Sequence, residues 1–176
     1  MYIQQTIKWI QSFVIELNLC PFAKHEMDNN AVRILVAPST TFDDGLIDFM
    51  AEIEYLNSNP TVGTTLLLFP HFLSDFIDYV DFVDFTEDAL LKTQHQGIYQ
   101  VATFHPAYCF HGTPVDDVSN YTNRSPYPML HILREEMLDR AIAYYGDTET
   151  IPANNITCLR KLGLNDVKNR LQNCMK

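Results

Sequence analysis

The strongest structural signal in the chain is the stretch TTLLLF (residues 64–69), a nearly continuous apolar run that ends at Pro70. A strand that is buried on both faces has this pattern, because neither of its faces needs polar side chains for solvent. The stretch therefore predicts a strand inside the core of the protein. Segments 32–37 and 99–105 predict two further strands.

Helical patterns surround these strands, with apolar residues that recur at steps of three and four. The first pattern covers residues 3–17, and Asn18 is predicted to be the left-handed residue that ends this helix. The second covers residues 42–56. Its start is predicted at Thr41, because Thr41 and Asp44 match a capping box.

The later segments are less uniform. Segment 72–95 has helical spacing, and Thr86 is a candidate cap for a second helix within it. Segment 125–145 is predicted to be one long helix, because Pro126 fits the first turn of a helix. Asn165 is predicted to cap a last helix.

Strands that are separated by helices of crossover length predict an α/β fold. We expect a small, mainly parallel sheet of three or four strands covered by helices. The chain has 176 residues and shows no repeat or Gly/Ser-rich linker. Because domains typically hold about 100–200 residues, we expect a single globular domain over residues 1–176.

Composition narrows the class of protein. The formal net charge is −10, and such a field repels phosphate backbones, so nucleic-acid binding is not expected. No apolar run approaches the length of a membrane span, and no basic segment follows Met1, so neither a membrane span nor a signal peptide is expected. The four cysteines form no C-x-x-C pair, which favours reduced thiols in a cytoplasmic protein.

The connection at residues 105–128 is the first candidate for a functional segment. It follows the third predicted strand and is rich in His, Asp, Asn and Arg. Unstructured connections longer than about 12–15 residues are uncommon in compact domains and are often functional. In open α/β sheets, ligands usually bind at the carboxyl ends of strands. We therefore expect a binding or catalytic pocket in the 105–135 loop and helix.

Two hypotheses compete for Arg134, which falls on the apolar arc of the helix predicted at 125–145 and is therefore expected to point into the protein. A buried guanidinium needs an anionic partner. In the first hypothesis, Arg134, Arg124 and the free amides at the start of that helix hold a small anionic metabolite. In the second, Arg134 pairs with Asp116, Asp117 or Glu135 and only holds the loop in place.

The first hypothesis also assigns roles to histidines and asparagines. His105 and His131 would transfer protons as acid or base. Asn120 and Asn123 would orient the ligand or the loop. The sequence indicates neither a reaction nor a cofactor for such a pocket.

Cys20 is the second candidate site. If Pro21 starts a short helix, Cys20 is its N-cap, where the helix dipole lowers the pKa of a thiol. A redox or sensor function through Cys20 would follow from such a thiolate. The alternative, a small buried hydrophobic side chain, is favoured because no partner for the thiol is close in the sequence.

Other clusters predict no site. His105, Cys109 and His111 have a spacing that metal ligands can have, but no second pair of ligands accompanies them, so no metal is predicted. The aspartates at positions 75, 78, 81 and 84 are typical of a solvated helix face. An acidic surface that meets a basic partner in a non-enzymatic interaction module remains a third functional hypothesis.

Three motifs together resemble a known family. They are LNLCPFA at residues 17–23, QVATFHP at 100–106 and NYTNRSPYPMLH at 120–131. From Trp9 to about Gly163, the chain is similar to the bacterial family called domain of unknown function 1415. The resemblance implies a small stand-alone protein and supplies no reaction.

The resemblance also bears on single residues. The positions that match the family's motifs are Cys20, Pro21, His105, Pro106, Tyr108, Phe110, Gly112, Asp117, Asn120, Asn123, Arg124, Ser125, Pro128, His131, Arg134 and Glu135. Cys109 and His111 do not belong to the pattern, which further weakens the metal hypothesis.

Overall fold

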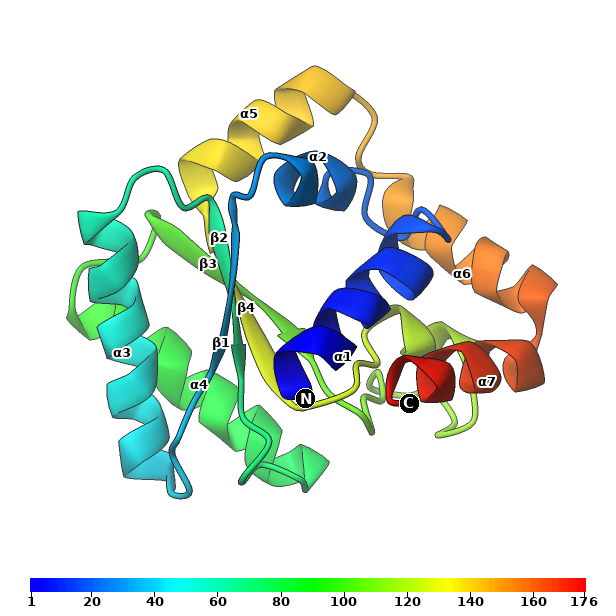
Figure 1. Cartoon of the computed structure of the whole chain (residues 1–176), viewed down its shortest axis with the longest axis horizontal. Helices are drawn as coiled ribbons and strands as arrows, with labels where there is room; N and C mark the ends of the chain where they lie inside the picture. Colours follow the sequence, from blue (N-terminus) through cyan, green and yellow to red (C-terminus); the bar gives the residue numbers. More distant parts are fainter.

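The apolar stretch of the sequence forms strand β2 (Thr64–Leu68), and all five of its residues are buried. In the computed structural model, which describes residues 1–176, β2 lies inside a four-stranded sheet with the strand order β1-β2-β4-β3 (Figure 1). The other strands are β1 (Val32–Val36), β3 (Tyr99–Phe104) and β4 (Met129–Arg134). The predicted α/β class and the three predicted strands are confirmed.

Helices α3 (Phe42–Ser58) and α4 (Phe76–Lys92) cover one face of the sheet. Thr41 caps α3 as predicted, since its side chain accepts a hydrogen bond from the Asp44 amide. The start of α4 is capped in the same way by Asp75. The helix break predicted at Thr86 is wrong. Thr86 is buried inside α4, where its hydroxyl donates to a carbonyl one turn earlier.

The two ends of the chain cover the other face of the sheet (Figure 1). From the N-terminus come α1 (Tyr2–Trp9), the π-helical segment η1 (Ile10–Ile15) and α2 (Ala23–Asp28). From the C-terminus come α6 (Ile151–Leu162) and α7 (Leu164–Cys174), which begins one residue before the predicted cap. Asn18 has a φ of 53°, as expected for the left-handed residue after η1.

The prediction of a mainly parallel sheet is wrong. Only β1 and β2 are parallel, whereas β4 is antiparallel to both of its neighbours, β2 and β3. Residues 129–134, predicted to lie in a long helix, form this fourth strand, and the helix α5 (Glu135–Tyr145) begins only after it. Strand pairing on both sides, together with complete burial of Met129, Leu130 and Ile132, outweighs the helical propensity of this segment.

This topology removes one expectation about ligand binding. The helices of both crossovers, α3 and α4, pack on the same face of the sheet. The crevice typical of doubly wound sheets arises where successive crossovers lie on opposite faces, so the topology creates no such crevice here. No helix combines the length and apolar character needed to cross a membrane.

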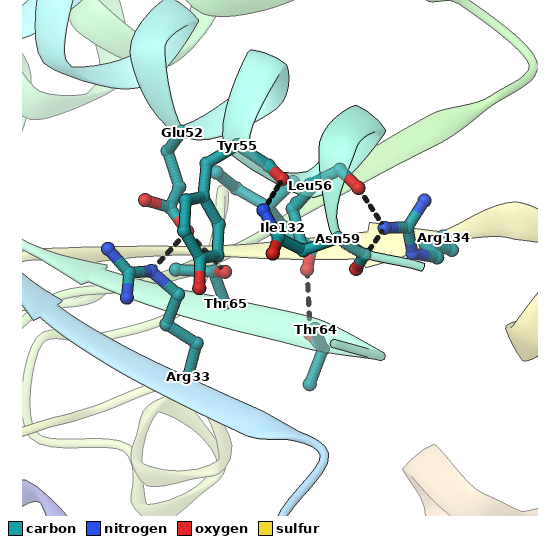
Figure 2. Close-up of polar contacts among 9 residues, drawn as sticks. All are labelled: Arg33, Glu52, Tyr55, Leu56, Asn59, Thr64, Thr65, Ile132 and Arg134. Atoms are coloured by element: carbon teal, nitrogen blue, oxygen red, sulfur yellow. Dashed lines mark hydrogen bonds and ion pairs between the residues drawn. The ribbon is translucent and has the colours of Figure 1, made fainter. Parts of the chain in front are cut away.

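Buried polar contacts tie α3 to the sheet (Figure 2). Glu52 of α3 is 2% exposed, and its Oε1 accepts hydrogen bonds from Arg33 Nε at 2.8 Å and from Thr65 Oγ1 at 2.7 Å. The Arg33 guanidinium also lies 4.0 Å from the ring centre of Tyr55. Both strands at this side of the sheet, β1 and β2, are therefore bonded to one carboxylate of α3.

Arg134 makes a second tie between α3 and the sheet (Figure 2). Its guanidinium donates to the Asn59 carbonyl at 3.2 Å, to the Val62 carbonyl at 3.0 Å and to the Leu56 carbonyl. It also donates to the Tyr99 hydroxyl at 3.0 Å. These carbonyls lie at and beyond the C-terminus of α3, where the helix dipole is negative, so a cation is favoured there.

Replacing Arg134 by Met is expected to lower the free energy of unfolding by about 2–3 kcal/mol, because several carbonyls lose a charged donor. Urea denaturation measures the change. The control is Arg140→Met on α5, whose exposed side chain pairs only with Glu136 at 3.5 Å. That variant is expected to stay within about 0.5 kcal/mol of the wild type. Equal stabilities of the two variants would contradict this role of Arg134.

Candidate functional site

The residues predicted to form one site lie in separate places. Arg124 precedes β4 and Arg134 ends it, so the two arginines lie at opposite ends of a strand whose six residues span roughly 17 Å. His131 lies in the middle of the same strand, and Cys20, the separate second candidate, lies between η1 and α2. The structure therefore does not bring Arg124 and Arg134 together around one anion. The helix start predicted at Pro126 lies instead at Glu135, next to Arg134 and a whole strand away from Arg124.

Arg134 also lacks the carboxylate partners of the second hypothesis. Asp116 instead forms an ion pair with Lys168 at 3.3 Å. Asp117 accepts a hydrogen bond from the Ser119 amide at 2.8 Å, and this bond lowers the pKa of the Asp117 carboxyl. Backbone carbonyls and the Tyr99 hydroxyl, rather than an acidic side chain, accept the hydrogen bonds of the Arg134 guanidinium.

Within the loop at 105–128, Asn120 holds the chain in shape. It is fully buried, and its Oδ1 accepts hydrogen bonds from the Phe110 amide and the Thr113 hydroxyl, both at 2.9 Å. Its Nδ2 donates to the Pro114 carbonyl at 2.9 Å and to the Val115 carbonyl at 3.2 Å. Because all these groups belong to the protein, Asn120 orients the loop rather than a ligand.

Asn123 closes the same loop onto the sheet. Its Nδ2 donates to the Thr103 carbonyl of β3 at 3.0 Å, and its Oδ1 accepts from Thr122 Oγ1 at 2.9 Å. Asn120 lies within the short 3₁₀ helix η2 (Val118–Thr122), and Asn123 follows the end of that helix. The loop is thus an ordered structure held by buried amide side chains.

His105 is buried at the end of β3, and both of its ring nitrogens are engaged. Nδ1 accepts a hydrogen bond from the Ala107 amide at 3.0 Å, so Nε2 carries the proton that is donated to the Leu73 carbonyl at 2.9 Å. Burial lowers the pKa of His105, although the Leu73 carbonyl and the charge of Asp75 act in the opposite direction. A neutral imidazole with no free nitrogen is not available to transfer a proton to a ligand.

Arg124 is the one charged residue of the predicted anion site that is buried. It is 8% exposed, its Nε donates to the Tyr108 carbonyl at 3.1 Å and its Nη2 donates to the Val115 carbonyl at 2.8 Å. The guanidinium carbon lies 4.4 Å from the ring centre of Tyr121. No carboxylate lies within ion-pairing distance of Arg124.

The Arg124 guanidinium has five N–H groups, of which two are used in these bonds. The other three, including both on Nη1, have no acceptor in the protein, and Nη1 is not fully buried, so a small molecule can reach it from solvent. A buried charge without a partner of opposite charge is unfavourable. Tyr121 was not predicted as part of this site. The sequence held no specific signal for this contact, because Arg124 lies beyond the end of η2 at Thr122.

His131 lies on the sheet face that α1 covers, between Leu66 of β2 and Ala102 of β3. It is half-buried, and neither ring nitrogen forms a hydrogen bond with the protein. Burial lowers the pKa of His131 to about 4, so the imidazole is neutral at neutral pH. Because His105 follows β3 and packs against Phe76 of α4, the two predicted acid–base histidines lie on different faces of the sheet.

Cys20 does not cap a helix. Pro21 and Phe22 form a turn, and α2 begins only at Ala23. Burial raises the pKa of the Cys20 thiol, while the amides of Phe22 and Ala23 lower it by less. No histidine forms a hydrogen bond with this thiol. The environment therefore disfavours the thiolate that a redox or sensor function requires.

No group of three His, Cys, Asp or Glu side chains is placed to hold a metal ion. Cys109 contacts only its own loop, with its Sγ 3.5 Å from the Thr113 carbonyl. His111 is exposed.

Comparison with known proteins supplies a family but no activity. The family model described as "Protein of unknown function (DUF1415)" matches residues 1–169. No curated protein and no solved structure matches the chain. The match confirms the resemblance inferred from the three motifs and extends it to nearly the whole chain.

The lowered pKa of His131 predicts a dependence of stability on pH. In the unfolded chain, a histidine binds a proton near pH 6.5, but folded His131 does so only near pH 4, so acidification between these values favours unfolding. At pH 4.5, His131 alone is expected to reduce stability by roughly 2–3 kcal/mol relative to pH 7.5. Urea denaturation of wild type and His131→Phe at both pH values measures this contribution.

The control for this experiment is His111→Gln, which replaces an exposed histidine and should leave the pH dependence unchanged. The lowered pKa of His105 changes stability with pH in the same direction as that of His131. All three proteins contain His105, so its contribution cancels when they are compared. An unchanged pH dependence in His131→Phe would contradict the assignment.

The burial of Cys20 predicts slow alkylation at neutral pH. Reaction of the folded protein with iodoacetamide, followed at this cysteine by peptide mass spectrometry, should reach half its maximal rate above the pKa of a free thiol, about 8.5. A midpoint near neutral pH would instead restore the thiolate hypothesis.

Proposed function

We propose, for a chain that belongs to the DUF1415 family of proteins of unknown function, that its function is to bind a small anion at Arg124. The observation that carries the proposal is the buried guanidinium, 8% exposed, with no carboxylate partner. The net charge of −10 makes this absence more significant, because acidic side chains are abundant in the chain. An anion that binds here supplies the negative charge that no carboxylate of the protein provides at this position.

The surroundings hold the guanidinium in one orientation. Two carbonyls fix Nε and Nη2, and the Tyr121 ring covers one face of the group. The loop that carries these carbonyls is itself held by Asn120. The unused N–H groups therefore have a fixed direction, which reduces the entropy that is lost when a ligand binds.

The chemistry of the group defines the ligand class. A guanidinium offers parallel N–H groups that match the oxygens of a carboxylate or a phosphate. The overall negative charge of the protein opposes large polyanions such as nucleic acids, but opposes a singly or doubly charged small molecule much less. The proposed ligand is a small metabolite with one carboxylate or phosphate group.

Binding, rather than catalysis, is the function that these contacts support. The nitrogens of His105 and the amides of Asn120 and Asn123 are used within the protein. His131 belongs to another part of the sheet. No free acid or base accompanies Arg124, so the proposal includes no reaction.

Inorganic phosphate and acetate are expected to raise the melting temperature of the wild type, because a ligand that binds only the folded state stabilises it. At about a hundred times its dissociation constant, the gain is roughly 2.7 kcal/mol. Arg124→Met should lose this response, whereas Arg140→Met, which removes an exposed arginine, should keep it. Differential scanning calorimetry at constant ionic strength measures the effect.

Arg124→Lys distinguishes ligand binding by Arg124 from its support of the loop, because lysine retains the positive charge but lacks the planar fork of N–H groups. Native mass spectrometry of the freshly purified wild type gives a second readout, in which an anionic adduct should disappear on denaturation and be absent from Arg124→Met. A wild type that responds to neither anion, or an unchanged response in a folded Arg124→Met variant, would refute the proposal.

A further inference from the structure

Two polar side chains of α1 point into the protein without a partner. Thr6 is fully buried and Trp9 is 3% exposed, yet neither Thr6 Oγ1 nor Trp9 Nε1 forms a hydrogen bond. The residues are three apart, so they lie on the same side of the helix, one turn from each other. Buried polar atoms are almost always bonded in folded proteins, and each exception asks for an explanation such as a bound molecule.

A third unpartnered group lies across from α1 on the sheet. The Trp9 ring packs edge-on against Phe104 of β3, with ring centres 5.5 Å apart. The Phe104 ring centre lies 6.3 Å from that of His131. The His131 nitrogens form no hydrogen bond in the protein but, unlike Thr6 Oγ1 and Trp9 Nε1, they are not fully buried. Trp9 belongs to the same buried cluster as Leu66, the residue paired with His131 across β2 and β4.

These three groups are all polar but uncharged. The indole of Trp9 only donates a hydrogen bond, the Thr6 hydroxyl donates and accepts, and a neutral imidazole does one of each. None of them carries a charge at neutral pH, since burial keeps His131 unprotonated. The surrounding side chains, Phe104 and Leu66, are apolar. A charged ligand would lose its hydration here and find no countercharge.

We propose that the layer between α1 and the face of β3 and β4 is a binding site for an uncharged, flat molecule that forms hydrogen bonds with Trp9, His131 and Thr6. An aromatic ring with an amide group has this chemistry. The site shares no residue with the anion site at Arg124, so it stands independently of that proposed function.

Trp9 is the single tryptophan of the chain, so its signals report directly on this layer. The experiment follows the indole N–H resonance of Trp9 in the ¹⁵N-labelled full-length protein during titration with nicotinamide, an uncharged aromatic amide. The control ligand is nicotinate, which has the same shape but carries a negative charge. Nicotinamide is expected to shift the resonance saturably at millimolar concentration, with nicotinate at least about tenfold weaker.

Three variants complete the test. Thr6→Val keeps the volume of the side chain and removes only the hydroxyl, and His131→Phe keeps a flat ring and removes the nitrogens. Each should weaken the binding of nicotinamide by about tenfold, as expected when one partner of a hydrogen bond is lost. Arg124→Met should leave it unchanged.

Three results would overturn the proposal. The first is the absence of a saturable shift with nicotinamide, which would leave ordered water as the partner of these groups. The second is equal binding of nicotinate. The third is unchanged affinity in both Thr6→Val and His131→Phe. If Arg124→Met loses its response to phosphate while nicotinamide binding persists, the two sites are separate.

Discussion

The insertion of β4 between β2 and β3 is the constraint on which the rest of the structure depends. β4 is the only strand that runs opposite to the other three, and it pairs with one strand on each side. Its alternating side chains place Leu130 and Ile132 against α3 and α4, and place Met129 in the cluster beneath α1. A shift of one residue in this register would exchange the two cores.

Strand β4 also separates Arg124 and Arg134, which the sequence analysis assigned to the same anion site. At the far end of β4, Arg134 donates to carbonyls at the C-terminus of α3, where partial negative charge collects. On the other side, Arg124 has only two carbonyls and an aromatic ring around a full positive charge. The first arginine is satisfied by the fold, and the second is the group on which ligand binding is proposed.

The polar residues around Arg124 explain why the long loop is ordered. Asn120, Asn123 and His105 use their side chains to bond backbone groups, so the loop has a single shape before any ligand binds. A prearranged group binds with less loss of entropy than a mobile one. Residues that were predicted to transfer protons or to orient a ligand therefore hold the loop in place.

The sequence by itself determined the elements with strong local signals: the apolar strand β2, the Thr41 cap of α3, the left-handed Asn18 and the family. The segment 129–134 was decided only by tertiary structure, because its residues suit a helix locally, and pairing with β2 and β3 makes it a strand. The carbonyl partners of Arg134 lie 72 to 78 residues away in the chain, and Tyr99 lies 35 residues away. Such contacts have no local signal, so only the folded chain decides which arginine is satisfied and which is free.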